Sequence, residues 1–599
     1  METLDPFSDY YQRELDYLRN AGRKFARQYP KVAKRLDFSE VESSDPHVER
    51  LLESFAFLTA RLQRTIDDDF PRITSALIGM LYPPLQEPVP SFAISQFKTS
   101  PKVGKLTSIY SIPRGTMLNV RDSQDTPCYF QTCYPIDLAP VNVTAVEVVS
   151  TDQDGLRERT ESIQAFRIRV ESYSGTFGSI GLNKLRFHIA GNRLLQNSIY
   201  ESIFTVPDAP IIRTDHGWSS LLDDSLQDVG FNVDENLQPL SAHRYAGHRL
   251  IQEYFCFPEK FLFFDLKDLG RYKDVSSFDI YLPISKDIPM KTTDVSVRNF
   301  LLGCTPIVNL FSKISEPLRL DQRSNEYRLI ADHRREKTTE IHSIQAVHAA
   351  VEDIENPQVI YPYFSFEKHG GEEEARAFWN MRRVPTINTS QDGTDAMISF
   401  VDLDFNPQLP ASQVIYAHLL CTNRSLAHLV PAGAILQTDV SMPVSEIVCL
   451  DRPTPQVYPP QEAKSQWQLI ANLSLNQLSL SNDDLSLSAL KSILHTYSDA
   501  LTMNTHPEID AIQTISTETV SRRILNDSWR GFVRGTKISL TFSDLQKRQT
   551  TAFLFSAVLS RFFSLYTAIN SYTELEIRKA HQDGYWKKWK PQSGSQELL

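Results

Sequence analysis

The stretch DPHVERLLESFAFLTARLQRTIDDDFP, residues 45–71, combines a strongly apolar helical pattern with one histidine, two glutamates and three consecutive aspartates. Asp45 is a good N-cap residue, and Pro46 suits the first helical position. Large apolar side chains then recur every three or four residues, which predicts a helix over 45–70 with one apolar face. This face consists of Val48, Leu51, Leu52, Phe55, Leu58, Leu62 and Ile66, widened by Ala56, Phe57 and Ala60.

The polar residues of this stretch do not form a metal site within one helix. His47 lies in the first turn, whereas Asp67, Asp68 and Asp69 lie near the other end, roughly 30 Å away at the rise of an α-helix. Two interpretations of the wide apolar face stay open. The helix packs inside its own domain, or it joins a bundle of helices from several subunits.

Residues 7–29 show a second helical pattern whose later half is basic. The basic residues are Arg19, Arg23, Lys24, Arg27, Lys31, Lys34 and Arg35. They are explained by a solvated face near the helix C-terminus, by a docking site for an acidic partner, or by nucleic-acid binding. Pro71 could open a third helix through Met80, and the Pro83–Pro84 pair ends the helical segment.

Beyond residue 90 the pattern becomes strand-like. Short alternating segments are bounded by turn residues in SFAISQFK, SIYSIPRGTML, FRIRVE and LRFHIA, and the aromatic run at 253–266 is also more typical of strand than of helix. Helical patterns return at 489–501 and 551–575. The sequence therefore predicts an α+β multidomain protein with an N-terminal helical arm, β-rich middle domains and a mixed C-terminal domain with a long apolar helix. The expected segments are 1–90, 91–240, 241–370 and 371–599.

Composition favours an ordinary soluble chain. There are 62 basic and 73 acidic residues, giving a formal net charge of −11, which does not favour nucleic-acid binding. Six cysteines without CxxC spacing fit a reducing compartment. No secretory signal and no apolar run of about 18 residues is visible. We expect a cytoplasmic protein without membrane insertion.

Motifs for catalysis or cofactor binding are weak. RGFVRGTKIS (530–539) lacks the spacing of a phosphate loop, and SGTFGSIG (174–181) predicts a turn rather than a nucleophile elbow. His243 and His248 are five positions apart and do not align on one helix face. WKKWK (586–590) could stack on single-stranded nucleic acid, but a tail whose tryptophans dock on a neighbouring subunit is the simpler interpretation. We expect no enzyme activity, no cofactor, no metal and no nucleic-acid partner.

The predicted C-terminal helix is apolar on nearly all sides. Its central stripe consists of Leu554, Val558, Phe562, Leu565 and Ile569, flanked by Phe553, Phe555, Leu559 and Phe563. A helix of this kind must be buried on most sides. We expect one side in the core and another against a second copy of the chain or a neighbouring wedge.

Several segments, in order along nearly the whole chain, resemble the TssF family of type VI secretion baseplate subunits, also called VasA or ImpG. They include YYQRELDYLRNAGRKFARQYPKVAKRL, the 45–71 stretch, LYPPLQEPVPS, EYFCFPEKFLFFDL, CTPIVNLF, CTNRSLAHL, QWQLIANLSLNQLSL, RGTKISLTF and AVLSRFFSLYTAINSYTEL.

The resemblance implies a structural subunit of the baseplate wedge in a contractile injection machine, with no known catalytic residue. It implies assembly with TssG as main partner, a second TssF copy, TssK, TssE and the VgrG hub, in a baseplate docked to the inner-membrane complex. The alternative is a wedge protein of another phage-like contractile system. On this basis we expect the 45–70 helix to join a bundle with the 7–29 helix and helices of TssG.

Overall fold

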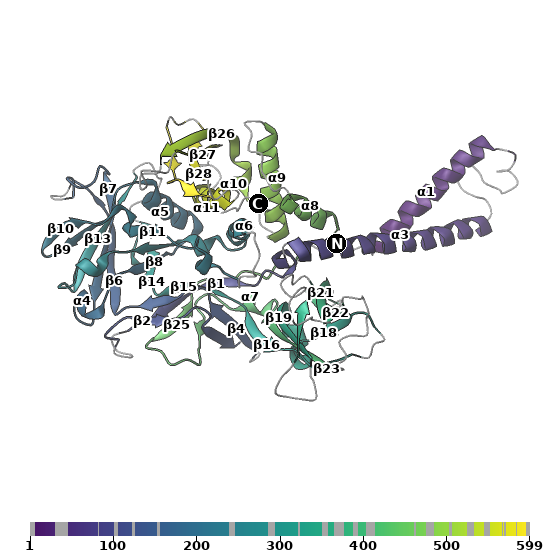
Figure 1. Cartoon of the computed structure of the whole chain (residues 1–599), viewed down its shortest axis with the longest axis horizontal. Coiled ribbons are helices and arrows are strands. Elements are labelled where there is room, and N and C mark those ends of the chain that lie inside the picture. Colours follow the sequence, from purple (N-terminus) through teal and green to yellow (C-terminus); the bar gives the residue numbers. More distant parts are fainter. Residues whose placement is uncertain are drawn as a thin grey trace. The chain divides into compact units, whose positions relative to one another are not determined.

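The computed structural model separates the chain into two compact units, shown in Figure 1. The helical unit comprises Met1–Leu81 with Gln461–Ile470, and the β-rich unit comprises Tyr82–Pro460 with Ala471–Leu599. The structure describes residues 6–29, 31, 46–81, 83–100, 106–121, 126–152, 156–238, 246–285, 294–320, 324–349, 358–363, 377–386, 393–402, 414–459, 463–474, 484–501, 506–523, 532–543, 552–565, 567, 571–580, 582 and 584–594.

The helical unit is built on the packing of α1 (Pro6–Gln28) against α3 (Pro46–Leu81). Both predicted N-terminal helices are therefore present. Arg19 of α1 donates a hydrogen bond of 3.0 Å through Nε to Glu49 of α3. Ala56 and Ala60 are completely buried on the side of α3 that also carries Glu49. Their small side chains allow the two helix backbones to approach closely.

The predicted break at Pro71 is wrong, because α3 continues without interruption to Leu81. A proline inside a helix removes one hydrogen bond and costs about 3 kcal/mol. The helix is held on both sides of the proline, by the buried Ala56 and Ala60 before it and by the buried Thr74 and Ile78 after it. The predicted stop is confirmed: α3 ends before the 3₁₀ turn η1 (Pro83–Gln86).

Six sheets form the described part of the β-rich unit (Figure 1). The six-stranded sheet has the order β24 (Ile435–Leu436), β25 (Glu446–Cys449), β1 (Phe92–Lys98), β15 (Cys304–Val308), β4 (Pro127–Thr132), β3 (Met117–Arg121). A two-stranded sheet pairs β2 (Tyr110–Ile112) with β5 (Ile136–Leu138). The five-stranded sheet has the order β10 (Gly217–Ser220), β9 (Ile211–Thr214), β13 (Ser277–Ile284), β7 (Gln164–Ser172), β6 (Val141–Ser150). The four-stranded sheet has the order β11 (Leu226–Asp228), β12 (Phe263–Leu266), β8 (Leu185–Ile189), β14 (Phe300–Leu302).

The two remaining sheets lie further along the chain. The eight-stranded sheet contains β16 (Phe311–Ile314), β17 (Leu318–Arg319), β18 (Tyr327–Leu329), β19 (Glu340–Ala349), β20 (Gln358–Pro362), β21 (Ala377–Pro385), β22 (Thr394–Asp402) and β23 (Val414–Thr422). The C-terminal sheet contains β26 (Ile512–Arg523), β27 (Phe532–Phe542), β28 (Tyr572–Lys579), β29 (Lys587–Lys588) and β30 (Gln592–Ser593). Helices of the β-rich unit are α4 (Phe177–Ile180), α5 (Arg193–Thr205), α6 (Ala246–Cys256), α7 (Leu426–Leu429), α9 (Asp484–Leu501), α10 (Pro507–Asp510) and α11 (Ala552–Leu565).

The six-stranded sheet joins strands from three of the predicted segments. β1 and β4 come from 91–240, β15 from 241–370, and β25 from 371–599. These segments are therefore not independent domains. The predicted boundaries near 240 and 370 fall inside one compact unit, because non-local strand pairing cannot be seen in local patterns.

Two local predictions need correction. Residues 253–256 of the aromatic run belong to α6, and the strand β12 begins only at Phe263. The apolar segment 551–575 is not one long helix, because α11 ends at Leu565 and β28 begins at Tyr572. β28 pairs in parallel with β27, so α11 is the crossover between them. The fold is a mixed α/β multidomain architecture with N-terminal helices and a β-rich middle, without the long apolar helix.

Candidate partner-binding surface

The predicted apolar face of α3 is largely exposed. The exposed fractions are 71% for Leu51, 58% for Phe55, 57% for Leu58 and 65% for Leu62. We call these four residues the α3 stripe. Their spacing of four, three and four residues places them on one line along the helix. Exposed apolar surface of this kind marks sites of protein interaction.

The core contact of α3 uses only one edge of the predicted apolar face. α1 covers the side with Ala56, Ala60 and the half-buried Leu52, so the predicted face divides between a packed and an exposed part. The side chains of Val48 and Ile66 lie outside the described residues, so their role in the α3 stripe stays a prediction. His47 is exposed at the start of the helix.

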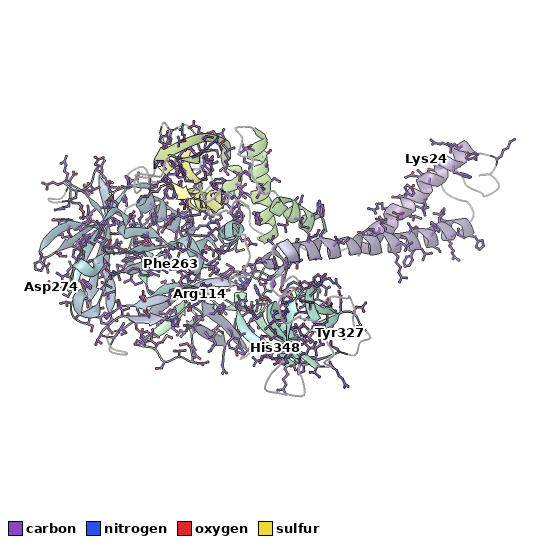
Figure 2. The ribbon with its side chains drawn as sticks, in the orientation of Figure 1. Lys24, Arg114, Phe263, Asp274, Tyr327 and His348 are labelled. Carbon is purple, nitrogen blue, oxygen red and sulfur yellow. The ribbon has the colours of Figure 1, made fainter. Side chains whose placement is uncertain are left out.

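α1 adds aromatic and basic side chains to the exposed surface of the helical unit. Tyr17, Phe25 and Tyr29 are exposed, and the rings of the last two lie 5.3 Å apart. Lys24, labelled in Figure 2, is exposed, as are Arg23 and Arg27. Arg19 of the basic run bonds to Glu49 between the two helices.

A third element completes the helical unit. The first part of α8 (Ala463–Ser474) packs at the end of α3, where the hydroxyl of Thr74 donates a hydrogen bond to the side chain of Gln466. Both residues are buried, and so is Leu469. Trp467 is 57% exposed beside this contact. Sequence patterns did not identify this pairing, because the local sequence of a helix carries no information about a partner almost four hundred residues away.

The C-terminal apolar stripe is not a surface. Leu554, Val558 and Phe562 are 2%, 0% and 0% exposed, so the chain's own core surrounds them. The side chain of Leu565 and the whole of Ile569 lie outside the described residues. The expected contact of this stripe with a second copy is therefore corrected for the three described residues: α5, α6 and β28 already pack against α11.

The three motifs considered above for catalysis or ligand binding have structural roles in the fold. The described part of RGFVRGTKIS belongs to β27, where Gly535 lies under the ring of Tyr572 so closely that a Cβ would be 2.5 Å from it. In SGTFGSIG, Thr176 caps α4 and Gly181 ends it in the left-handed conformation, as expected for a turn. The indole of Trp586 donates to Glu201 at 2.8 Å and packs near Phe553. The tail thus docks on this chain's own core.

Buried ionisable groups are present, and the examples below are held by a charged partner or by main-chain carbonyls. Lys260 is completely buried, bonds to Glu253 and donates to the main-chain carbonyl of Glu235 at 3.1 Å. Burial lowers the pKa of Lys260, and Glu253 acts in the opposite direction. Burial also lowers the pKa of His188 to about 4 and keeps this ring neutral. No group of three or more His, Cys, Asp or Glu side chains in the described ranges is placed to hold a metal ion.

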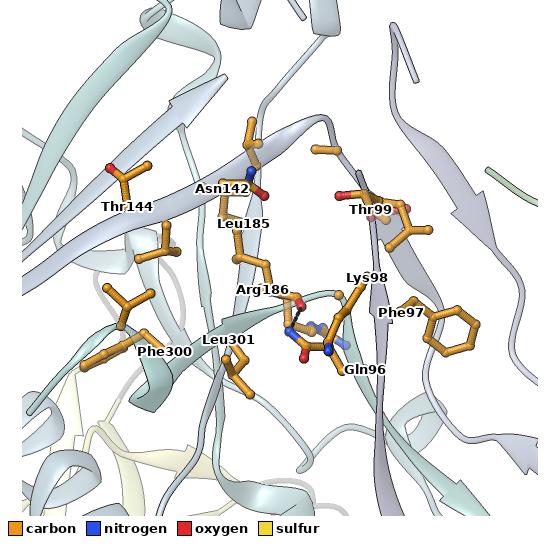
Figure 3. Close-up of a pocket in the computed structure, with 18 residues that line it drawn as sticks. Gln96, Phe97, Lys98, Thr99, Asn142, Thr144, Leu185, Arg186, Phe300 and Leu301 are labelled. Atoms are coloured by element: carbon orange, nitrogen blue, oxygen red, sulfur yellow. Dashed lines mark hydrogen bonds between the residues drawn. The ribbon is translucent and has the colours of Figure 1, made fainter. Parts of the chain in front are cut away.

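Figure 3 shows a cavity of about 420 Å³ lined by residues of β1, β6, β8 and β14. Gln96 donates to the main-chain carbonyl of Leu302 at 3.3 Å, and Arg186 is bound by Asp265 at 2.7 and 2.8 Å. The side chains of Gln96 and Arg186 are thus held by partners within the protein. As for the membrane question, none of the helices within the described ranges has both the length and the apolar character that a crossing requires.

The fold and the α3 stripe define the class of protein: a multidomain, β-rich chain whose N-terminal helices carry an exposed apolar face. The chain belongs to the family described as Type VI secretion system, TssF, which matches residues 3–596. It is 31% identical over 617 aligned residues to the type VI secretion system component TssF1 of Pseudomonas aeruginosa, with 99% of each chain covered.

Two solved structures have a similar fold. A chain of the TssK–TssF–TssG baseplate subcomplex, determined by cryo-electron microscopy, superposes with a TM-score of 0.71 at 22% identity, covering 92% of this chain and 99% of that one. A chain of the type VI secretion baseplate complex superposes with a TM-score of 0.56 at 19% identity, covering 99% of this chain and 100% of that one. The family expected from the sequence is confirmed.

Proposed function

We propose that this protein is a structural subunit of the type VI secretion baseplate wedge, without catalytic activity, and that the α3 stripe is its docking face for TssG. The observation that carries the proposal is the row of four exposed large apolar side chains on a helix whose opposite side is already covered by α1. Membership in the TssF family supports the secretion context. A solved relative of similar fold comes from a complex with TssG and TssK, which supports the choice of partner.

The spacing of the α3 stripe suits a helical partner. Residues at i, i+4, i+7 and i+11 act as anchors when one amphipathic helix lies in the groove of others. Fully burying a large aliphatic or aromatic side chain contributes about 1.5–3 kcal/mol. Burial of the four side chains therefore contributes favourable free energy of the same order as the cost of association. The spacing and apolar character of the α3 stripe therefore favour binding to helices of TssG rather than to a flat polar surface.

The remaining partners belong to the same proposal. We expect TssK, TssE, the VgrG hub and a second TssF copy to bind other surfaces of the wedge, in a cytoplasmic baseplate docked to the inner-membrane complex. The exposed Arg23, Lys24 and Arg27 of α1 give a second candidate surface, suited to an acidic protein partner. The family match favours a type VI machine over another contractile injection system.

The test is copurification with TssG after coexpression. Leu58→Asp and Phe55→Asp place a carboxylate in the α3 stripe, which is harmless in solvent but costs several kcal/mol when buried unpaired in an interface. Both variants should keep the circular dichroism spectrum of the wild type and lose most of the bound TssG.

Two matched controls define the surface. Phe57→Asp introduces the same charge on the same helix, at an exposed position outside the α3 stripe, and should retain TssG. His47→Ala should also retain it, because no step of the proposal uses its ring. Full TssG binding by Leu58→Asp would show that the α3 stripe is free surface. Loss of binding in His47→Ala that divalent metal restores would show that a metal site had been misread.

A further inference from the structure

Two connectors carry the chain between the β-rich unit and the segments of the helical unit. The first connector, residues 83–91, follows α3 and leads into β1. The second connector, residues 451–459, follows β25 and leads toward α8. Both connectors belong to the β-rich unit. They are not independent loops, because each contacts the other.

The connectors are paired with each other by main-chain hydrogen bonds. The amide of Val89 donates to the carbonyl of Val457 at 2.8 Å, and the amide of Val457 donates back at 3.1 Å. Further along, the amide of Thr454 donates to the carbonyl of Phe92 at 2.8 Å, and its hydroxyl accepts from the amide of Phe92 at 2.9 Å. A displacement of one connector would therefore break bonds of the other.

Both connectors also reach the same strand, β19. The carboxylate of Glu87 in the first connector lies 3.8 Å from Nε2 of His342. The side-chain amide of Gln456 in the second connector donates to Glu340 at 2.8 Å. Glu340 and His342 are two residues apart on β19 and are both nearly completely buried. The two contacts thus lie next to each other on the eight-stranded sheet.

Other buried side chains hold this region of β19 in place. Arg383 of β21 donates to the main-chain carbonyl of Ile341 at 2.9 Å and also bonds to that of His342. Thr394 of β22 donates to Glu340 at 2.6 Å through its hydroxyl. Arg424, after β23, lies 3.7 Å from the same carboxylate. Residues of β21 and β22, and one that follows β23, therefore support the surface that the connectors contact.

We propose that Glu87 and Gln456, together with Glu340, His342 and Arg383, form a latch that holds both connectors on the β-rich unit and releases them together. The latch is a conformational device: a cooperative element with an attached and a released arrangement, as regulated assemblies use. Several of its polar atoms are incompletely satisfied. His342 Nε2, Arg383 Nε and Gln456 Oε1 are buried without a hydrogen-bond partner among the described residues.

This incomplete satisfaction lowers the cost of release. A buried polar group without a partner costs about 1–3 kcal/mol, which opening to water recovers. The groups that face Glu87 are His342 of β19 and Arg383 of β21, with Glu340 and Arg424 behind them. Because Glu87 has a raised pKa near neutrality, its charge in this environment is not permanent. The attached arrangement of the connectors is therefore only modestly more stable than the released one. A small difference of this kind allows the connectors to switch between the two.

The test is hydrogen–deuterium exchange of the full-length protein without partners, followed by mass spectrometry of peptides covering 83–92 and 451–459. Glu87→Ala removes the contact of the first connector only, and Gln456→Ala that of the second only. Gln456→Ala should raise exchange in both peptides by roughly five- to tenfold, the effect of losing one net hydrogen bond. Glu87→Ala removes a contact of 3.8 Å rather than a hydrogen bond and should raise exchange in both peptides by a smaller factor. Glu87→Gln, which keeps the shape of the group, should show a smaller increase.

The matched control is Lys98→Ala, which removes an ion pair of 2.7 Å with Glu446 on the neighbouring β1–β25 edge and should leave both peptides unchanged. Peptides from β19 and β23 report on the sheet itself and should also stay protected. Increased exchange confined to the mutated connector would show that the connectors move independently. A uniform increase across the sheet would show that these residues only stabilise the core. Either result overturns the latch and leaves the proposed TssG surface untouched.

Discussion

Thr74 on α3 donates a hydrogen bond to Gln466 on α8, a residue 392 positions later in the chain. Gln466 also accepts from the hydroxyl of Ser75 at 3.3 Å. The contact attaches a helix of the C-terminal half to the N-terminal helices and makes both part of one compact unit. The helical unit is thus assembled from the N-terminal segment Met1–Leu81 and the distant short segment Gln461–Ile470.

We expect Gln466→Ala to destabilise the end of α3. Loss of this side chain leaves the buried hydroxyl of Thr74 without its acceptor, at a cost of about 1–3 kcal/mol. Urea unfolding followed by circular dichroism measures the difference. Trp467→Ala, an exposed neighbour on the same helix, should change stability by no more than about 0.5 kcal/mol. Equal effects of the two substitutions would contradict the assignment.

Lys260 and Glu253 form a completely desolvated ion pair, so breaking it from one side should be severe. Lys260→Met leaves the Glu253 carboxylate with Arg249 at 3.9 Å and the amide of Leu237 at 2.8 Å, and should lower the free energy of unfolding by about 3 kcal/mol. The double variant Lys260→Met/Glu253→Gln removes both charges and should recover part of the loss. A double variant no more stable than the single one would mean that packing, rather than charge, dominates at this position. Urea unfolding compares the three proteins.

Phe562 should matter for stability and not for self-association. It is completely buried in α11, so Phe562→Ala should cost about 3–5 kcal/mol in the free energy of unfolding. Thermal unfolding measures this loss, and Leu194→Ala on the exposed side of α5 is the surface control. Crosslinking between copies should be unchanged wherever the variant remains folded. A folded variant that loses crosslinking would restore the expectation of a contact between copies at this helix.

Glu87 should give the protein a stability component that decreases as pH rises. Burial raises the pKa of Glu87 to about 7, with Arg383 acting in the opposite direction. The folded state therefore holds a proton that the unfolded state has released above its ordinary value near 4.5. This contribution is fully present below about pH 4.5 and is lost as pH rises through about 7; it amounts to about 2–3 kcal/mol.

The comparison with Glu87→Gln isolates this effect. The glutamine has no proton to lose, so its unfolding free energy relative to the wild type should increase between pH 5 and 8. His342, whose pKa burial lowers to about 3, acts in the opposite sense, because its stabilising contribution is present above 6.5 and lost as pH falls. Because Glu87 lies 3.8 Å from His342 Nε2, the difference between the two proteins reports Glu87 together with its coupling to His342. Parallel pH curves for the two proteins would contradict a raised pKa at Glu87.

The local periodicity of the sequence determined the helices over 7–29 and 45–70, the strands such as β1, β7 and β8, and the helical pattern at 489–501. Each depends on side chains within about ten residues of one another, so a local pattern carries the information. The order of quoted segments along the chain also determined the family. The apolar face of α3 was visible in the same way, as a row containing Leu51, Phe55, Leu58 and Leu62.

Only the tertiary structure decided which side of that face is available. α1 covers Ala56 and Ala60, leaving the α3 stripe in solvent, and the choice depends on how two helices approach each other. In the same way, packing decided that Phe562 is core, that 551–575 divides into a helix and a strand, and that Gln466 belongs with Thr74. These outcomes depend on contacts between residues far apart in the chain, whose free energies exist only once the whole core has formed, so no local pattern could contain them.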